Sequence, residues 1–406
     1  MSDFWKRDAR AMINVNGWKP KICIQGGGAK GAWEAGVLAG LIDSDEIEPT
    51  AMFGTSAGAL NALWASTAPV STFSEHMLGR WLELSRQVML VAIFCGGLFS
   101  LAVFLTRKLV CPSWFGAIGC AVILPLLVIL ILAGMVRLRL IKRIPGILPI
   151  QWAARLLPMV QADARWHCYF CTADVALKEP PHAGDWGRKA TFQIVPGERK
   201  AGLVQCDEQY ENCSWDARVA AMTSAALPGL FRSLRVGNRH FLDGGLEANL
   251  PAAYVVSNGA LGGNCIICIV PTPVKLLNPK NHVDFRVLHL LDRIEAEQKC
   301  GRADPTANIV GMSVLCPALV ISPEVKLRSG LLCGFFRPKL LRAEFDAGRL
   351  AGLDARKAMR SFQEGNNYAL DSHLLEKICR PRHDKYIPPG SGLWALWMNG
   401  NWPLKL

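Results

Sequence analysis

Gly54-Thr55-Ser56-Ala57-Gly58 follows the apolar stretch Thr50–Phe53 and opens a helix-like stretch that extends from Ala57 to Ser66. A strand, a sharp turn and a helix in this order are typical of a nucleophile elbow, in which a serine is exposed at the turn and small neighbours let the turn close. The five-residue pattern alone is weak, because glycine and serine are common. It gains weight from two other glycine motifs, Gly26-Gly27-Gly28-Ala29-Lys30-Gly31 upstream and Asp243-Gly244-Gly245 downstream.

Short apolar runs alternate with helix-like runs around the elbow. Lys21–Gln25 predicts a buried strand, the glycine loop follows it, and Ala32–Ile42 predicts a helix. Trp215–Ala226 predicts another helix, and further strands are expected at Cys168–Ala173, Ala190–Val195, His240–Leu242 and Cys265–Val270. Strands that alternate with helices favour a mainly parallel central sheet covered by helices, so the expected fold class is α/β.

The three glycine motifs together fit acyl transfer, which needs a nucleophile, a base and donors for an oxyanion. Ser56 is the candidate nucleophile. Asp243 is the candidate base, because the two glycines after it give the backbone room to turn beside the carboxylate. The loop Gly26–Gly31 leads from a strand into a helix N-terminus, where free backbone N–H groups favour negative charge. Such a loop suits an oxyanion as well as a phosphate.

The glycine loop also formally fits G-x-G-x-x-G, the dinucleotide-binding fingerprint, which is a weak match by itself. The acidic residue that this fingerprint requires would be Asp45, Glu46 or Glu48, but these precede the next strand instead of ending it. A Walker-type phosphate loop is excluded, because Lys30 is followed by Gly31 and not by Ser or Thr.

The bulk composition leans towards membrane association. The chain has 406 residues, of which 51% are hydrophobic and 19% charged, and a net charge of +12. The stretch from Leu84 to Ala162 contains no Asp or Glu and eight Lys or Arg residues, and taking these eight from +12 leaves +4 for the rest. Because these basic residues flank apolar runs, they indicate a membrane boundary and not a nucleic-acid surface.

Two apolar runs without a charged residue interrupt the sheet pattern. Val88–Leu105 has 18 residues and Phe115–Val136 has 22. At about 1.5 Å per residue, each run is long enough for a helix that crosses a hydrocarbon core of about 30 Å. We expect a two-helix membrane hairpin, and a buried helical hairpin in a soluble core is the alternative.

The hairpin also predicts a location. An even number of crossings returns the chain to one side of the membrane, so Ser56 and Asp243 can meet there. Basic residues flank the outer ends of the hairpin more heavily than its connecting loop, which places the outer ends in the cytoplasm. No cleavable signal peptide is visible before residue 17. We therefore expect a bacterial inner-membrane protein whose catalytic part faces the cytoplasm and contacts anionic lipids of the inner leaflet.

Cysteines and histidines offer alternative chemistry. The pairs Cys168/Cys171 and Cys265/Cys268 have zinc-like spacing, but residues three apart on a strand point to opposite faces, which favours buried thiols. A Ser-Asp-His triad needs a histidine after Asp243. His240 fits a hydrogen-bond partner better than a catalytic group. The later histidines have no strand-end or glycine-rich context: His282, His289, His373 and His383.

Four motifs follow one another along about residues 20–270, apart from the insertion: Gly26–Leu38, Gly54–Ala62, Ser224–Phe231 and Asp243–Pro251. By these motifs the chain strongly resembles the patatin-like phospholipase family. The resemblance implies a three-layer α/β/α fold with a mainly parallel central sheet, here interrupted by the membrane hairpin. It also implies a Ser–Asp dyad without histidine, and no metal or organic cofactor.

The resemblance implies a role for each motif residue. Ser56 would be the nucleophile and Asp243 the direct proton acceptor. In this family the loop often has Asp before the glycines and Arg within it, whereas Gln25 and Lys30 stand there in this chain. Lysine keeps the charge but lacks the guanidinium fork. The oxyanion hole would consist of Gly26, Gly27, Gly28 and Lys30, and the remaining motif glycines are Gly31, Gly54, Gly58, Gly244 and Gly245.

These expectations divide the chain into four parts. Residues 20–83 form the first part of the core, 84–150 the hairpin with helices at about 88–105 and 115–136, 151–300 the second part of the core, and 301–406 a C-terminal region. Within the last part, Lys326–Arg342 mixes apolar and basic residues as an interfacial segment does. Ordinary core packing is the alternative for that segment, and for the three tryptophans of the tail.

The expected function is that of a membrane-anchored serine acyl hydrolase, which cleaves glycerolipid esters through an acyl-enzyme on Ser56. A lipid acyltransferase with the same dyad, and a non-catalytic membrane scaffold that retains the fold, are the alternatives. The expected partners are the glycerolipid substrate and anionic lipids, and no nucleic acid is expected.

Overall fold

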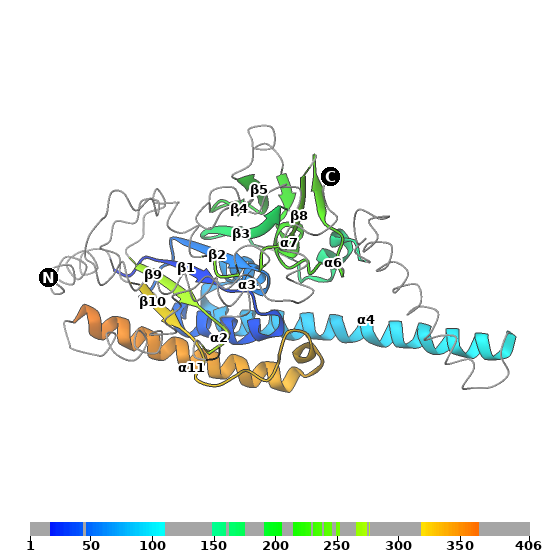
Figure 1. Cartoon of the computed structure of the whole chain (residues 1–406). Coiled ribbons are helices and arrows are strands. Elements are labelled where there is room, and N and C mark those ends of the chain that lie inside the picture. The colour runs from blue at the N-terminus through cyan, green and yellow to red at the C-terminus, as the bar shows by residue number, and fades with distance from the viewer. Residues whose placement is uncertain are drawn as a thin grey trace, which may run out of the picture.

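The fold is seen in a computed structural model, which Figure 1 draws whole. The residues that it describes are 17–43, 46–109, 148–159, 162–174, 191–204, 214–228, 230–237, 239–245, 249–251, 265–273, 276 and 318–364.

Five parallel strands form the centre of the sheet. Each pairs in parallel with its neighbour. Every residue of three of them, β1, β2 and β9, is buried, which explains why they read as continuous apolar runs in the sequence. In spatial order the five are β10 (Ala318–Ile321), β9 (Cys265–Ile269), β1 (Pro20–Ile24), β2 (Ala51–Thr55) and β3 (His167–Asp174). The predicted mainly parallel α/β fold is confirmed for this centre.

Strand β3 marks the change from parallel to antiparallel pairing. Its first part pairs with β4 (Thr191–Ile194), and the sheet continues through β5 (Lys200–Val204) to β6 (Ser214–Asp216). Its last residues pair instead with β8 (Arg239–Asp243), which in turn pairs with β7 (Leu234–Val236). The sheet therefore divides at the carboxyl end of β3, and the strand that ends at Asp243 lies in this division.

Helices follow the central strands in the sequence. After β1 come η1 (Gly28–Lys30) and α2 (Gly31–Ile42), and after β2 come α3 (Ala57–Thr67), η2 (Val70–Thr72) and α4 (Phe73–Leu109). The other described helices are α6 (Ile150–Leu156), α7 (Ala217–Ser224), η7 (Cys333–Phe336) and α11 (Pro338–Gln363). Helix α7 is shorter than predicted, because residues 214–216 pair with β5 and the Asp216 carboxylate then caps the helix at the N–H of Arg218.

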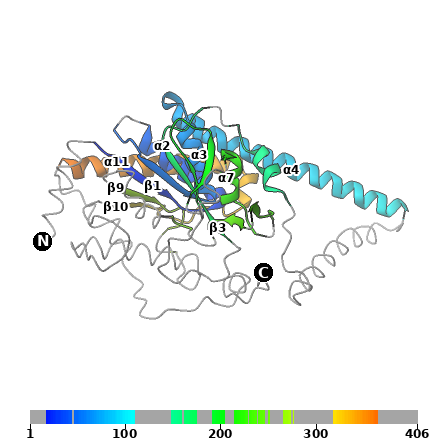
Figure 2. The same cartoon turned by 90° about the horizontal axis from the view of Figure 1, so that it is seen from above.

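Helix α11 covers α2, all of whose twelve residues are buried. Figure 2 shows α2, α4 and α11 together on one side of the strands. A Cβ atom at Gly36 of α2 would lie 2.0 Å from the carbonyl oxygen of Phe345, and one at Gly348 of α11 would lie 2.0 Å from that of Trp33. Glycine on both helices therefore lets the two backbones touch. The sequence analysis did not predict this helix.

Helix α4 contains the first of the two apolar runs, Val88–Leu105. The second run, Phe115–Val136, lies outside the described residues. Within the described ranges, no helix combines the length and the apolar character that crossing a bilayer requires. The predicted transmembrane hairpin is therefore not supported by the described part of the chain.

Candidate active site

Ser56 lies on a strained turn between β2 and α3. Its φ of 54° and ψ of −121° make it the one non-glycine residue with positive φ among those described. Its neighbours Thr55 and Ala57 are buried, whereas Ser56 itself is half-buried. A Cβ atom at Gly54 would lie 2.2 Å from the carbonyl oxygen of Gly58, so only glycine lets the turn close. The predicted strand–turn–helix elbow is thus confirmed.

The register of the sheet brings Asp243 to Ser56. Thr55, the residue before the serine, pairs with Cys171 of β3. The next residue of β3, Thr172, pairs with Asp243 of β8. Side chains 187 positions apart in the sequence therefore meet, and the Ser56 hydroxyl donates a hydrogen bond to Asp243 Oδ2 at 3.0 Å.

The Asp243 carboxylate is buried and held in place by two donors. Only 4% of the residue is exposed. Burial raises the pKa of Asp243 to about 6, and this rise is opposed by hydrogen bonds from the Gly245 N–H and the Ser56 hydroxyl. The N–H of Gly245 lies 2.7 Å from Oδ1, which leaves Oδ2 directed at the serine. At neutral pH the carboxylate is therefore mostly ionised and can accept a proton.

Ser224, at the end of α7, joins the elbow to β3 and to the turn after Asp243. The backbone N–H of Ser56 lies 3.1 Å from both the carbonyl oxygen and the hydroxyl oxygen of Ser224. The Ser224 hydroxyl donates to the carbonyl of Cys171 at 2.5 Å, and its carbonyl accepts the N–H of Gly244 at 3.2 Å. Sequence reasoning gave Ser224 no role, although it begins one of the four motifs.

The glycine loop follows β1 and touches the elbow. A Cβ atom at Gly26 would lie 2.9 Å from Ser56 Cβ, so the loop and the serine are in contact. The N–H of Gly26 donates to the carbonyl of Asn249 at 3.0 Å, and the N–H of Ala29 donates to that of Leu331 at 2.8 Å. Gly26 was predicted as an oxyanion donor, but this bond engages its only N–H. The N–H groups of Gly27 and Gly28 have no backbone hydrogen bond to another described residue.

Lys30 lies at the same edge of the sheet. Its ammonium group donates to the Thr272 hydroxyl at 3.0 Å, just beyond the end of β9. The positive charge thus sits beside the glycine loop, held by a residue that sequence reasoning did not identify.

A second buried carboxylate, Glu34, lies in the first turn of α2. Its Oε2 accepts a hydrogen bond from Asn61 of α3 at 2.9 Å, and Asn61 in turn accepts one from the Trp81 indole at 2.8 Å. Burial raises the pKa of Glu34 well above its ordinary value, against smaller lowering effects of Asn61 and the Lys30 charge. Its Oε1 is buried without a hydrogen-bond partner, and a Cβ atom at Gly27 would lie 3.3 Å from it.

The alternative candidates lie elsewhere. His240 Nδ1 is hydrogen-bonded to the Ser233 hydroxyl at 2.9 Å, as expected for a hydrogen-bond partner. The cysteines of both zinc-like pairs are buried on β3 and β9, and the described residues contain no group of side chains that could hold a metal ion. The other histidines considered lie outside the described residues: His282, His289, His373 and His383.

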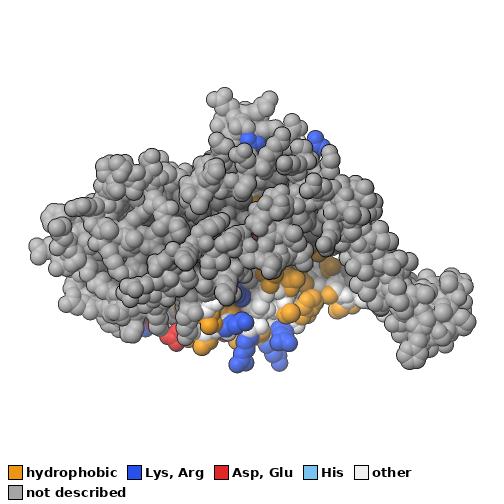
Figure 3. Space-filling view, in the orientation of Figure 1, with side chains coloured by type: hydrophobic (Ala, Val, Ile, Leu, Met, Phe, Trp, Pro, Cys, Tyr) orange, Lys and Arg blue, Asp and Glu red, His pale blue; other side chains and the backbone are white. Residues whose placement is uncertain are grey.

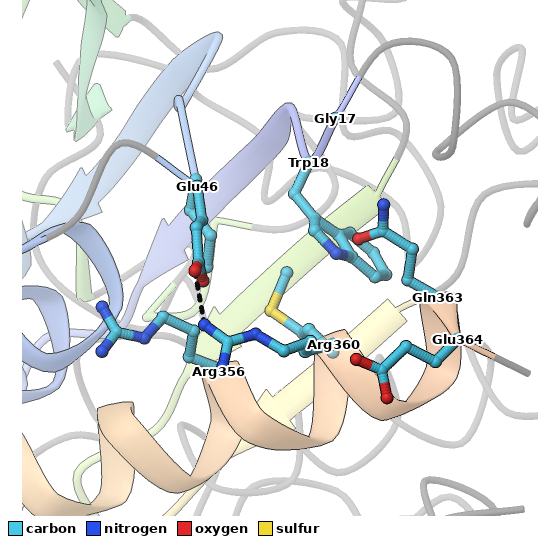
Figure 4. A pocket seen from close by; sticks show the side chains of 9 residues that line it. Gly17, Trp18, Glu46, Arg356, Arg360, Gln363 and Glu364 are labelled. Carbon is cyan, nitrogen blue, oxygen red and sulfur yellow. Dashed lines mark hydrogen bonds and ion pairs between the residues drawn. The ribbon is translucent and has the colours of Figure 1, made fainter. Parts of the chain in front are cut away.

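A pocket of about 690 Å³ lies at the other end of the strands (Figure 4). Its wall includes Trp18, which precedes β1, and Ile47, which precedes β2. An ion pair between Arg360 and Glu46 crosses it. Ser56 follows β2 and lies at the opposite, carboxyl end, so this pocket is separate from the serine site.

Comparison with known proteins places the site in a family. The model of the patatin-like phospholipase family matches residues 22–256, which is more than half of the chain. Among curated proteins, none matches the sequence. The match contains the elbow, the glycine loop and Asp243.

Two solved structures are distantly similar. VipD from Legionella pneumophila is similar over 84% of this chain and 67% of its own length, with a TM-score of 0.30 and 11% identity. Human GIVD cytosolic phospholipase A2 is similar over 93% of this chain and 63% of its own length, with a TM-score of 0.39 and 10% identity. The chain thus spans less than two thirds of the human enzyme. On the strength of the family match, this chain belongs to the patatin-like phospholipases, a family of lipid acyl hydrolases.

Proposed function

We propose that the protein is a membrane-associated serine hydrolase that cleaves the ester bonds of glycerolipids through an acyl-enzyme on Ser56. The observation that carries this proposal is the hydrogen bond of 3.0 Å from the Ser56 hydroxyl to Asp243 Oδ2, at an elbow whose serine is half-buried and strained. The family match supplies the substrate class.

Asp243 acts as the base in the first half of the reaction. Its Oδ2 takes the hydroxyl proton while Ser56 Oγ forms a bond to the ester carbonyl carbon. The carbonyl oxygen becomes an oxyanion. When the tetrahedral intermediate collapses, the bond to the glycerol oxygen breaks and the Asp243 carboxyl returns the proton to that oxygen. The deacylated lipid leaves, and the acyl group stays on Ser56.

The N–H groups of Gly27 and Gly28 stabilise the oxyanion. Gly26 and Ala29, on either side of them, use their own N–H groups in structural hydrogen bonds. These two bonds hold the loop in place, so that its middle N–H groups are oriented before the substrate arrives. The Lys30 ammonium adds positive charge beside the loop.

Water completes the cycle. Asp243 takes a proton from a water molecule, whose oxygen attacks the acyl carbonyl carbon. The bond to Ser56 Oγ breaks, the Asp243 carboxyl returns its proton to that oxygen, and a fatty acid is released.

The apolar half of α4, which is the run Val88–Leu105, brings the enzyme to a membrane. Large apolar side chains are exposed there, among them Ile93 at 71% and Phe94 at 66%. Large apolar side chains that lie exposed together on one helix are typical of an interaction site. The transmembrane hairpin and the cytoplasmic orientation rest on the sequence alone, because the second apolar run lies outside the described residues. Extraction of membranes at high pH, followed by protease protection, tests both.

Ser56→Ala is the variant that tests the chemistry. The wild-type protein should react with a fluorophosphonate probe and release fatty acid from phospholipid vesicles, and Ser56→Ala should do neither. Ser66→Ala is a matched control, because the buried Ser66 hydroxyl donates to a carbonyl of its own helix. Undiminished lipid hydrolysis in Ser56→Ala contradicts the proposal. Transfer of the acyl group to an added alcohol, with no free fatty acid, identifies an acyltransferase instead.

A further inference from the structure

The connection between β10 and α11, residues 322–337, begins at the edge of the sheet where Ser56 lies. Strand β10 belongs to the same parallel set as β1 and β2. The carboxyl ends of parallel strands meet at one edge, where sheets of this class bind their ligands. Ser56 follows β2 there, and the β10–α11 connection follows β10.

The connection is bound to the glycine loop on one side and to α11 on the other. The carbonyl of Leu331 accepts the Ala29 N–H, and a Cβ atom at Gly334 would lie 2.8 Å from that of Ala29. The buried Glu344 carboxylate of α11 accepts the N–H of Arg328 at 2.7 Å and that of Ser329 at 2.9 Å. These bonds hold the connection at a fixed position relative to the glycine loop, so a surface that binds the connection also lies at a fixed position relative to that loop.

The outer side of the connection is apolar. Four large hydrophobic side chains are about half exposed or more: Val325 at 72%, Leu331 at 53%, Phe336 at 50% and Leu332 at 47%. Leu331 and Leu332 adjoin the carbonyl that holds the glycine loop. Exposed large apolar side chains next to the glycine loop are not explained by the packing of the protein itself.

Basic residues surround these apolar side chains. The only acidic residue between positions 322 and 343 is Glu324. No ion pair joins the basic residues to any other described side chain. They are all exposed: Lys326, Arg328, Arg337, Lys339 and Arg342. Figure 3 shows Lys and Arg side chains that project beside apolar ones, in the region where α4 passes the start of α11.

The connection packs on α4. The rings of Phe335 and Trp81 stack with their centroids 5.9 Å apart, and the Ser85 hydroxyl donates to the Phe335 carbonyl at 2.5 Å. Beyond this contact, exposed large apolar side chains of α4 begin at Leu90 and continue at Ile93 and Phe94. The connection thus contacts the part of α4 that leads directly into its apolar half.

We infer that the β10–α11 connection docks the protein on an anionic lipid bilayer and sets the glycine loop at the lipid surface. The inference rests on the proposed function and names the surface through which that function reaches its substrate. Leu331, Leu332 and Phe336 enter the interface, while the basic residues meet lipid phosphates. An acidic protein or a nucleic acid would satisfy the charges but would not by itself account for the apolar side chains.

Vesicle sedimentation tests the docking, with Ser56→Ala as the background so that no lipid is consumed. We expect binding to phosphatidylglycerol-containing vesicles and weaker binding to pure phosphatidylcholine. Arg337→Gln/Lys339→Gln should lower the affinity about thirtyfold at low salt, since each basic residue near an anionic surface contributes about fivefold. Lys357→Gln/Arg360→Gln, which removes the same charge from later turns of α11, should change it far less.

The apolar part has its own pair of variants. Leu332→Ser/Phe336→Ser should lower the affinity about tenfold or more, because two side chains no longer enter the interface. Leu350→Ser on α11 is the control, since Leu350 is 63% exposed and lies outside the connection. Thermal melting of each variant checks that the fold is retained.

A comparison of two substrates separates docking from chemistry. With Ser56 restored, the ratio of vesicle-lipid hydrolysis to hydrolysis of a soluble short-chain ester should fall in the connection variants and not in the controls. Equal binding by wild type and both connection variants, or equal loss in the controls, overturns the docking inference. If vesicle binding depends on the connection but lipid hydrolysis persists in Ser56→Ala, the proposed chemistry is wrong. The docking inference then still stands.

Discussion

Asp243 and Glu34 are both carboxylates that the fold buries beside the elbow, and both accept a hydrogen bond from the strand–turn–helix unit. Asp243 accepts from Ser56 at the turn, and Glu34 accepts from Asn61 within the helix. They differ in their further partners, since Asp243 also has the Gly245 N–H, whereas Oε1 of Glu34 has none.

The difference in partners affects how far burial raises the pKa of each carboxyl group. Burial raises both pKa values, but the two donors limit the rise at Asp243 to about 6, while the pKa of Glu34 lies well above its ordinary range. Asp243 is therefore ionised at neutral pH and can take a proton. Glu34 keeps its proton to higher pH than an ordinary glutamate does, and its hydrogen bond to Asn61 links α2 to α3.

The largest expected effect is on the rate of ester hydrolysis. Asp243→Asn removes the base and should lower kcat/KM about 10²- to 10⁴-fold. Glu34→Gln keeps a neutral group of the same size and should lower it by less than about fivefold, or about 1 kcal/mol. Steady-state kinetics on a soluble ester measures both. Comparable losses in the two variants would mean that Glu34 also serves the chemistry.

The pH dependence of the rate comes next in size. Because the base must be ionised, kcat/KM should rise with pH up to about 6 and then level off, and at pH 4 it should be about a hundredfold below the plateau. The profile of Glu34→Gln should have the same midpoint. A midpoint near the ordinary Asp value would show that Asp243 is less desolvated than the structure indicates.

A smaller effect is expected on stability, with the opposite sign. The folded protein keeps the Asp243 proton up to about pH 6, whereas the unfolded chain loses it near pH 3.8, so the free energy of unfolding falls as the pH rises through this window. Asp243→Asn does not titrate and should be more stable than wild type by about 1–3 kcal/mol above pH 7. Denaturant unfolding at pH 4 and pH 8 measures the difference, which should nearly vanish at pH 4.

The smallest effect is expected for Glu34→Gln. At low pH, where the buried group is protonated, the variant should match wild type within about 1 kcal/mol. As the pH rises through the raised pKa of Glu34, folded wild type must bury a charged carboxylate, which lowers its free energy of unfolding. The variant carries no such charge and should become more stable than wild type. A difference that stays constant between pH 5 and pH 9 would show that Glu34 does not titrate in this range.

The sequence predicted the residues of the site better than their contacts. Ser56, Asp243 and the glycine loop were recognisable because each belongs to a short local pattern with its own backbone requirement. The division of the sheet at β3 was not predictable, since it depends on how Thr172 pairs with a residue 71 positions later. For the same reason the bonds from Gly26 to Asn249 and from Ala29 to Leu331 were missed, although they decide which N–H groups remain for an oxyanion.

Charge-free apolar runs were a less reliable guide. Val88–Leu105 does form a helix, but that helix begins as early as Phe73, where Trp81 and Ser85 pack on the body of the protein. The apolar pattern predicts a helix and an apolar contact, and it does not by itself predict what the helix contacts.

The backbone contact between α2 and α11 fixes the order in which this protein can become active during synthesis. The family match ends at residue 256, yet the helix that carries the glycine loop is covered by residues 338–363. When the serine, the aspartate and the whole loop of a nascent chain have left the ribosome, Trp33 and Gly36 still lack the α11 backbone that they contact in the folded protein. We therefore expect no catalytic activity until α11, the last described helix, has left the ribosome. A nascent chain stalled before α11 should not react with a serine-directed probe.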